Sequence, residues 1–435
     1  MPIGGRKVPP NAIEKEQAVV ASTISGREVE LPAMWNRMFE PRVLTDHTPD
    51  GFAKLAALDG GESLEWCYGC GKCVPVCPVD MVGEYGPRKI HRKVQTGIDL
   101  LSDPDLWLCT TCMNCLRVCP KEVDMIQVMP AAREAALGEG NVPGELQDVF
   151  QKTFRYGNAL GENPRKRALW ARTAGVPVKI LPTDPSPVDV LFYVEDYWSY
   201  HPRGQDAARA FARVAHALGI DWGILGHEEK TLGDSQRLAG EKGLFDALVE
   251  DVTATLGKYE FNRIVTPDPH GFNALVKEYP KRGHTFDALH YTQLLAPLVD
   301  NISWQRELSY KVTFHDPCYL GRHNGEYDAP RTLINAIPGV ELTEMGRCRE
   351  NGYCCGGGGG GMWLDGFTRD YTSERLSERR VREAAATGAD MLVVCCPYEV
   401  SRFEDAAKST GNDQLRVADI IELMDEAMGL EPADG

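Results

Sequence analysis

The chain has 435 residues and a formal charge of −16, from 47 basic and 63 acidic side chains. This acidic balance argues against nucleic acid or an anionic membrane surface as a partner. No apolar run approaches the roughly 18–20 residues of a membrane-spanning helix, and the N-terminus has no apolar leader segment. We therefore expect a cytoplasmic protein of about three domains, which reaches a membrane, if at all, through a partner subunit.

The first 140 residues divide into an arm and a cysteine-rich domain. Residues 1–60 have weak periodicity that Gly, Pro and charged residues interrupt, which indicates an extended arm with a short helix near residues 51–58. Residues 61–140 contain the spacing Cys-x2-Cys-x2-Cys-x3-Cys-Pro twice. The eight cysteines are Cys67, Cys70, Cys73 and Cys77 in the first run, and Cys109, Cys112, Cys115 and Cys119 in the second.

This cysteine spacing predicts two [4Fe–4S] clusters. A cubane cluster needs four thiolates, of which a tight loop supplies three, and in two-cluster ferredoxins the fourth cysteine of each run ligates the other cluster. Structural zinc instead uses pairs of Cys-x2-Cys without a third cysteine three residues on. The assignment is therefore crossed: Cys67, Cys70, Cys73 and Cys119 hold one cluster, and Cys109, Cys112, Cys115 and Cys77 hold the other.

Helices are predicted within the cluster domain, and α/β structure follows it. The cluster-domain helices are expected over residues 87–97, 100–107 and 123–137. Residues 141–187, rich in Gly, Pro, Asn and Arg, are expected to form a linker. From residue 188 on, β-type runs alternate with amphipathic helices, which predicts parallel sheets covered by helices. Strands are expected at residues 188–194, 221–225, 263–265, 311–314 and 391–395, and helices at residues 205–218, 235–256, 272–278, 291–298, 368–386, 399–408 and 417–428.

Six further cysteines form a second group in the C-terminal third. They are Cys318, Cys348, the doublet Cys354 with Cys355, and the doublet Cys395 with Cys396. The first doublet runs into six glycines, which let the backbone approach a bulky group and offer N–H groups to electron-rich sulfur. The second doublet ends a predicted strand, where α/β sheets place their sites. We therefore expect a further iron–sulfur centre here.

At these residues the chain resembles the cysteine-rich CCG domains of heterodisulfide reductase. Those domains carry a Cys, then a Cys-Cys-Gly, then a Cys-Pro-x-Cys. Here 36 positions separate Cys318 from Cys354, and 41 separate Cys355 from Cys396. The stretch from Cys67 to about Arg133 likewise resembles that enzyme's ferredoxin-type subunit, so the resemblance covers about residues 61–425. It implies a catalytic [4Fe–4S] assembly of the noncubane type.

The chain departs from the family pattern at its last ligand. The family's final cysteine is replaced by Glu399, so Cys395, Cys348 or the Glu399 carboxylate is the candidate to complete the set, carboxylate being an acceptable hard ligand. The number of irons and the last ligand stay open on the sequence alone.

Two histidines flank Cys318 and are candidates for catalysis. With Asp316 and Arg322, His315 and His323 are placed to supply protons or to orient sulfur ligands. His315 equally fits a core histidine at the end of a strand. The catalytic candidates are therefore Cys318, Cys354, Cys355, Cys396, His315 and His323.

The family usually has two CCG repeats, and residues 188–305 match the first without its thiols. Asp196 lies 122 residues before Cys318, Thr231 and Leu232 lie 123 before the doublet, and Asp268 lies 128 before Cys396. This is a consistent internal period. Because no position holds a thiolate, this half is expected to bind no cluster.

These observations predict an α+β multi-domain chain. A ferredoxin-like, mostly helical domain with two [4Fe–4S] clusters is joined to two pseudo-symmetric α/β CCG domains, at residues 188–305 and 306–430. The resemblance implies thiol–disulfide chemistry on a sulfur compound, with a protein-bound substrate as one option and a flavin-containing or membrane quinone-linked subunit as partner. The alternatives are an electron-relay subunit of a flavin-dependent hydroxy-acid dehydrogenase and a non-catalytic electron-transfer scaffold.

Overall fold

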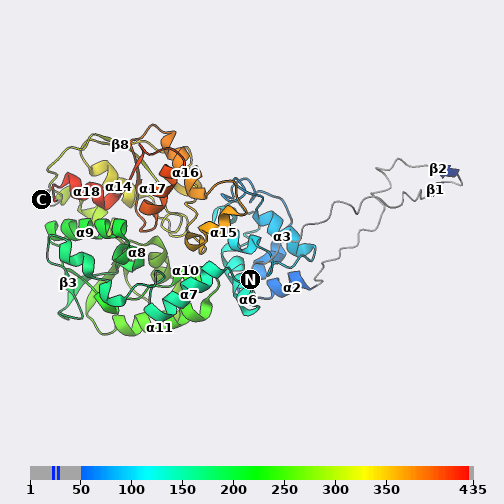
Figure 1. Ribbon diagram of the computed structural model, residues 1–435, viewed down its shortest axis with the longest axis horizontal. Helices are drawn as coiled ribbons and strands as arrows, with labels where there is room; N and C mark the ends of the chain where they lie inside the picture. Colours follow the sequence, from blue (N-terminus) through cyan, green and yellow to red (C-terminus); the bar gives the residue numbers. More distant parts are fainter. Residues whose placement is uncertain (1–21, 25–26, 30–49, 431–435) are drawn as a thin grey trace. The chain divides into compact units, whose positions relative to one another are not determined.

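The computed structural model describes residues 22–24, 27–29 and 50–430 (Figure 1). In the unit Met1–His47, strands β1 (Ser22–Ile24) and β2 (Arg27–Val29) form an antiparallel pair. The rest of the predicted arm up to residue 49 lies outside the described residues. The unit Thr48–Gly435 contains everything else. The short helix expected near residues 51–58 is present as α2 (Gly51–Ala56).

The cluster domain is mostly helical, as predicted. Its helix α6 begins where the Asp124 side chain accepts hydrogen bonds from the N–H groups of Ile126 and Gln127. The helix expected over residues 100–107 is shortened to one turn, α4. It begins only after Pro104, which precedes the helix as its N-cap. The other elements are η1 (Glu62–Trp66), α3 (Pro87–Gln95), α4 (Asp105–Leu108), α5 (Asn114–Arg117) and α6 (Met125–Gly138).

Two parallel sheets follow, with strand orders β3-β5-β4-β6-β7 and β11-β10-β8-β9. The strands of the first are β3 (Lys179–Ile180), β4 (Val188–Phe192), β5 (Trp222–Ile224), β6 (Phe261–Thr266) and β7 (Ala288–His290). Those of the second are β8 (Tyr310–Phe314), β9 (Val340–Leu342), β10 (Met391–Val394) and β11 (Arg416–Asp419).

The two sheets repeat one another in topology and register. The order β5-β4-β6-β7 corresponds to β9-β8-β10-β11. Phe192 pairs with Val265 in the first sheet, and Phe314 pairs with Val393 in the second. These pairs are related by the same 122- and 128-residue offsets that relate the two CCG repeats in the sequence.

Helices cover both sheets. In the first half they are α8 (Glu195–Tyr200), α9 (Pro202–Ala217), α10 (Asp234–Leu238), α11 (Lys242–Leu256), α12 (Pro269–Asn273) and α13 (Tyr291–Leu295). In the second half they are α14 (Asp328–Ala336), α15 (Asp365–Arg369), α16 (Leu376–Ala385), α17 (Glu399–Ser409) and α18 (Ile420–Ala427).

Further sequence expectations need correction. The helix expected over residues 235–256 is divided into α10 and α11. The expected linker, residues 141–187, holds strand β3 and helix α7 (Gly144–Tyr156), whose buried positions were hidden among polar residues. The helix expected over residues 368–386 is broken, because Ser373 donates to Val82 O and ties the chain to the cluster domain. The helix expected from residue 417 begins only after β11, where Asp419 caps α18.

One hydrophobic core is shared by both halves. Phe211 and Tyr291 from the first half pack in the same cluster as Phe314 and Ile420 from the second, and all four are at most 1% exposed. Helix α9 packs along α18 (Figure 1). Its inner face is largely alanine, which lets the two helices approach closely.

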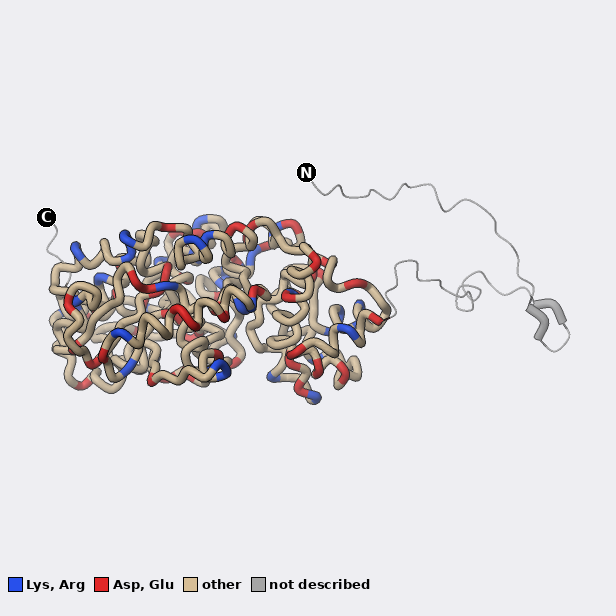
Figure 2. The backbone as a smooth tube through the Cα atoms, turned by 90° about the horizontal axis from the view of Figure 1, so that it is seen from below, with Lys and Arg blue, Asp and Glu red and all other residues tan. Residues whose placement is uncertain are grey.

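Both the charge distribution and the lengths of the helices can be assessed over the described residues. Acidic and basic residues are interspersed over the described part of the chain (Figure 2). Within that same part, every helix is too short or too polar to span a bilayer.

Candidate functional site

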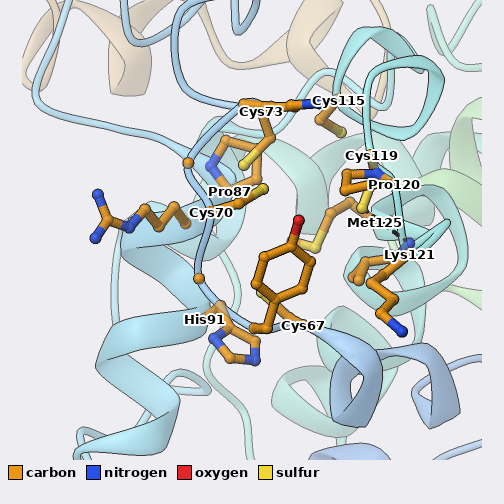
Figure 3. A pocket seen from close by; sticks show the side chains of 16 residues that line it. Cys67, Cys70, Cys73, Pro87, His91, Cys115, Cys119, Pro120, Lys121 and Met125 are labelled. Carbon is orange, nitrogen blue, oxygen red and sulfur yellow. Dashed lines mark hydrogen bonds between the residues drawn. The ribbon is translucent and has the colours of Figure 1, made fainter.

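The first cavity of the cluster domain gathers cysteines from both runs. Cys67, Cys70 and Cys73 line it together with Cys119, and Cys115 reaches its far side (Figure 3). Burial raises the pKa of the Cys73 thiol, and the nearby Cys67 and Cys119 add to the rise. The Lys72 N–H lowers the pKa of Cys70, which is exposed. This cavity therefore lies at the surface of the domain.

The second cavity is deeper and has the complementary composition. Cys109, Cys112 and Cys115 line it together with Cys77. Burial raises the pKa of Cys77 to about 12. Its loop is unusual, since Thr111 and Met113 have positive φ values of 50° and 72°, and Thr111 N donates to Cys109 Sγ at 3.4 Å. Each cavity thus includes three cysteines of one run and the fourth of the other, as crossed ligation requires, and Cys115 lines both cavities.

The C-terminal cysteines converge on the second cavity. The thiols of Cys112, Cys318 and Cys355 surround Cys354 and lower its pKa well below the usual value, and its sulfur donates to Thr110 Oγ1 in the cluster domain at 3.5 Å. Cys112, Cys318 and Cys354 pack in one buried cluster. Cys354 therefore lies between the CCG residues and the inner cavity of the cluster domain.

The glycines that follow Cys355 have two roles, as donors to sulfur and as sites of close backbone packing. Gly356 N donates to Cys354 Sγ at 3.3 Å, and Gly357 N donates to Cys355 Sγ at 3.4 Å. A Cβ on Gly358 or Gly359 would come within 3.0 Å of a carbonyl oxygen in the Cys109–Thr110 segment. The first glycines thus donate to sulfur as expected, whereas the next two let the cluster-domain backbone pack against them.

A histidine and a carboxylate complete the CCG site. Ligand atoms of His315, Cys355 and Glu399 lie within 4.8 Å of one another, and all three residues are buried. His315 Nε2 is 3.2 Å from Glu399 Oε1. Among the described residues, neither His315 Nε2 nor Glu399 Oε2 has a hydrogen-bond partner. Burial and the adjacent Arg380 hold the pKa of His315 well below its usual value.

These residues fit an iron–sulfur group. Buried polar atoms without partners are costly, and Glu399 Oε2 is one beside buried thiols. Thiolate and carboxylate are both ligands that iron accepts. The sequence alternative in which Glu399 occupies the last ligand position therefore has the best support among the three.

The structure separates Cys395 and Cys348 from this group, whereas Glu399 is among the charged neighbours of Cys396. Cys395 packs in the main hydrophobic core, whereas Cys396 lies against Tyr197 and Tyr398; neighbouring residues at a strand end point to opposite faces. Cys348 is partly exposed, and its charged neighbours include Glu344 and Asp316. Neither Cys395 nor Cys348 is brought to the Cys355–Glu399 pair.

His323 belongs to the contact between domains. Its Nε2 lies 2.9 Å from Thr111 O, and its ring stacks on Tyr319 with centroids 3.9 Å apart. Burial lowers its pKa to about 3. Tyr319 OH shares a 2.8 Å hydrogen bond with Thr111 Oγ1. The ring is therefore neutral and engaged, which argues against its predicted role as a proton donor.

Two arginines donate hydrogen bonds to the loop of residues 109–112, which lines the inner cavity. Arg322 Nε donates to Cys112 O at 2.6 Å. Arg133 donates to Cys109 O at 2.7 Å and to Gly359 O at 2.8 Å. Both arginines are buried. The loop of the inner cavity is thus fixed against the CCG residues by charged hydrogen bonds, which are stronger than neutral ones.

In the thiol-free half, the position that corresponds to Cys318 is occupied by Asp196, which belongs to a buried group of ion pairs. Arg167 contacts Asp196 at 2.5 Å and Glu229 at 2.7 Å, and all three side chains are at most 1% exposed. Glu195, which has a φ of 63°, accepts from Leu232 N at 2.9 Å. Sequence reasoning located Asp196 and Leu232 but missed Arg167, Glu195 and Glu229, because none of them occupies a motif position.

Comparison with known proteins places the chain among iron–sulfur oxidoreductases. Residues 63–123 match the family described as "4Fe-4S dicluster domain", and residues 312–398 match the CCG family, "Cysteine-rich domain". The chain is 30% identical over 405 residues to a subunit of the dihydromethanophenazine:CoB–CoM heterodisulfide reductase of Methanosarcina mazei, covering 85% of this chain and 95% of that protein. The chain belongs to the family of this heterodisulfide reductase subunit.

Two longer relatives are also similar. The probable iron-sulfur-binding oxidoreductase FadF of Bacillus subtilis is 36% identical over 340 residues. The EtfAB:quinone oxidoreductase of Syntrophomonas wolfei is 32% identical over 339 residues. Each alignment covers 76% of this chain and 47% of the relative, so the chain spans about half the length of these relatives.

Proposed function

We propose that the chain is the iron–sulfur subunit of a heterodisulfide reductase-like complex. In this proposal it links two [4Fe–4S] clusters to a CCG-type centre at which a sulfur compound is oxidised or reduced. The observation that carries the proposal is the buried cluster of Cys112, Cys318 and Cys354, which brings a cysteine of the inner cavity next to the CCG thiols.

The proposed ligand sets follow the three groups of side chains. The outer set is Cys67, Cys70, Cys73 and Cys119; the inner set is Cys77, Cys109, Cys112 and Cys115; and the CCG set is Cys318, Cys354, Cys355 and Cys396 with Glu399. When bound, such groups would carry single electrons and coordinate sulfur.

The chain's own residues prepare the CCG site. The Arg322 guanidinium lies near Cys112, Cys318 and Cys354 and favours their thiolate forms. The N–H groups of Gly356 and Gly357 point at two of the sulfurs. His315 directs an unpartnered ring nitrogen toward the same space. Together they stabilise negative charge on sulfur and exclude water.

The substrate class follows from the loss of one site. A chain with two thiol sites can hold both halves of a disulfide, whereas this chain can hold one, because Arg167 and Asp196 fill the other half. We therefore favour a sulfur carried on a protein or a lipoyl-type dithiol, persulfide or trisulfide over a free heterodisulfide. The partner that exchanges electrons would be a flavin-containing or quinone-linked subunit.

A second candidate is an electron relay without sulfur chemistry. The burial of the site favours it, since Cys318, Cys354 and Cys355 are 6%, 1% and 9% exposed. Under this alternative the CCG centre only passes electrons to a dehydrogenase or quinone-linked partner.

Iron and acid-labile sulfide analysis with EPR tests the proposal. Cys355→Ala should remove the CCG signal, and its response to added thiol or disulfide, while both cubane signals remain. Cys119→Ala should instead remove the cluster of Cys67, Cys70 and Cys73. Cys348→Ala is the control and should change neither signal. Full iron content and turnover in Cys355→Ala would overturn the proposal, and a CCG signal insensitive to sulfur compounds would favour the relay.

A further inference from the structure

His315 is held by a buried arginine from helix α16. Arg380 Nε donates to His315 Nδ1 at 2.9 Å. The Arg380 side chain is 0% exposed, and its Nη1 donates to Arg347 O at 2.8 Å and to Glu383 Oε2 at 2.9 Å. The guanidinium is therefore held through Nε and Nη1 and presents its Nε–H to the ring, whereas its Nη2 has no partner among the described residues.

This hydrogen bond determines where the ring proton lies. A guanidinium has only donors, so the His315 Nδ1 that faces it must be the bare, accepting nitrogen. The single proton of a neutral imidazole then lies on Nε2. A histidine that binds a metal through Nε2 shows the opposite pattern, because its Nδ1 carries the proton and donates it to a carboxylate, carbonyl or water.

The Nε2–H group faces the sulfur site. A ring nitrogen of His315 lies within 4.8 Å of the Cys355 sulfur, and Nε2 is 3.2 Å from Glu399 Oε1 without forming a hydrogen bond there. A buried donor without an acceptor is costly unless a bound group supplies one. The acceptor that this site would bring next to Cys355 is sulfur.

We propose that Arg380 is a positioning residue that holds His315 as an N–H donor to a sulfur bound beside Cys355, so that His315 is not a ligand to iron. This inference rests on the proposed function, because it needs a group at the CCG site. A hydrogen bond to sulfur stabilises the reduced form, which carries more negative charge, and so raises the reduction potential.

The direct test uses the holoprotein with 15N-labelled histidine. Pulsed EPR of the CCG centre should show only a weak nitrogen coupling, as expected for a hydrogen-bonded ring. A strong coupling, characteristic of nitrogen bound to iron, would overturn the inference. Absence of any third centre by iron analysis and EPR would overturn the proposed function instead, so the two failures are distinguishable.

Variants test the positioning role through the midpoint potential of the CCG centre. Arg380→Met removes the donor and should lower the potential with iron content unchanged, and Arg380→Lys, which restores a donor, should recover most of the shift. Arg382→Met on the same helix breaks an exposed ion pair with Glu374 and is the control. An unchanged potential in folded Arg380→Met would contradict the proposal.

His315→Gln covers the case in which the arginine variants do not fold. Glutamine keeps an N–H donor near the Nε2 position, so iron content and potential should stay close to those of the unaltered protein. Loss of the centre in this variant would show that the ring is a ligand. A potential shift in His315→Leu before substrate is added identifies a sulfur of the centre as acceptor; a shift seen only afterwards identifies a substrate sulfur.

Discussion

Arg167 is the centre of a buried group of ion pairs in the thiol-free half. Its guanidinium joins Asp196 and Glu229 in the thiol-free half, and the Asp196 carboxylate also accepts from Ala159 N. Removing one member of a buried ion pair leaves the other charge uncompensated. We therefore expect this residue to matter for stability rather than for iron binding.

We expect Arg167→Met to lower the free energy of unfolding by about 3–5 kcal/mol, measured by urea denaturation, with the iron content unchanged. Lys166→Met is the matched control, because its ion pair with Glu162 is exposed at 59% and 42% and should contribute less than about 1 kcal/mol. Loss of iron in folded Arg167→Met would contradict the view that this half is free of clusters.

At the scale of elements, the glycine run determines how closely two loops approach. Gly358→Ala would place a Cβ against Thr110 O, and overpacking of this kind costs about 1–3 kcal/mol. In cluster-free protein, the looser contact should make Cys354, now 1% exposed, react faster with a thiol reagent. The rate should rise about tenfold for each 1.4 kcal/mol, because labelling follows the open population.

Gly346→Ala provides the control for this experiment. A Cβ at Gly346 meets nothing within 4 Å, so its labelling rate should match that of the unaltered protein. Equal rates for the Gly346 and Gly358 variants would show that the glycine run does not govern the contact.

The cap of helix α18 makes stability depend on pH. Asp419 accepts from Tyr291 OH at 2.5 Å and from Ile421 N at 3.1 Å, and burial raises its pKa to about 7. The unfolded chain has an Asp pKa near about 3.9. Between these values the folded state binds more protons, so stability falls as pH rises.

Asp419→Asn keeps the capping oxygen and removes the titration. Urea midpoints at about pH 5 and about pH 8 should differ less in this variant than in the unaltered protein, and the Asp419 contribution over this range is on the order of 3 kcal/mol. The same pH dependence in both proteins would mean that Asp419 is already ionised at the lower pH.

Local patterns predicted the elements well where burial and periodicity agree. Strand β4 and helix α9 follow directly from such patterns, and the period that relates Asp196 to Cys318 recurs in the strand register. The break before α16 depends on Ser373 contacting Val82 O, a distant partner.

At the candidate site, too, the sequence could not predict what depends on contacts between residues distant in the chain. The cysteine spacing located the thiols and assigned Cys396 to the family motif, but it left Cys395 open as a possible last ligand. Only the strand's direction shows that Cys395 points into the core. Arg380 was missed because its role depends on a contact with His315 across 65 positions, and the charged residues around it resemble an ordinary exposed helix face.

At the scale of the whole molecule, the two α/β halves are one folding unit. Phe314, Ile420 and Met424 share their core with Phe211 and Tyr291. A fragment of residues 306–430 would expose this surface, and buried apolar side chains contribute about 1.5–3 kcal/mol each. We therefore expect that fragment not to fold, as measured by near-ultraviolet circular dichroism.

Residues 141–430 form the control fragment, since it keeps both halves together with Arg167. It should show native-like aromatic signals and one cooperative thermal transition. A folded 306–430 fragment would show that the halves are independent domains despite their common core.

The close contact around Cys354 also bears on how the protein is assembled in the cell. Cys112, Cys318 and Cys354 are 8%, 6% and 1% exposed, and the loop above them is fastened by Arg133 and Arg322. A preformed inorganic cluster has no passage between such tightly packed residues. If the C-terminal cysteines hold a cluster as proposed, we expect that cluster to be inserted before the ferredoxin-like domain docks, so that maturation follows a fixed order.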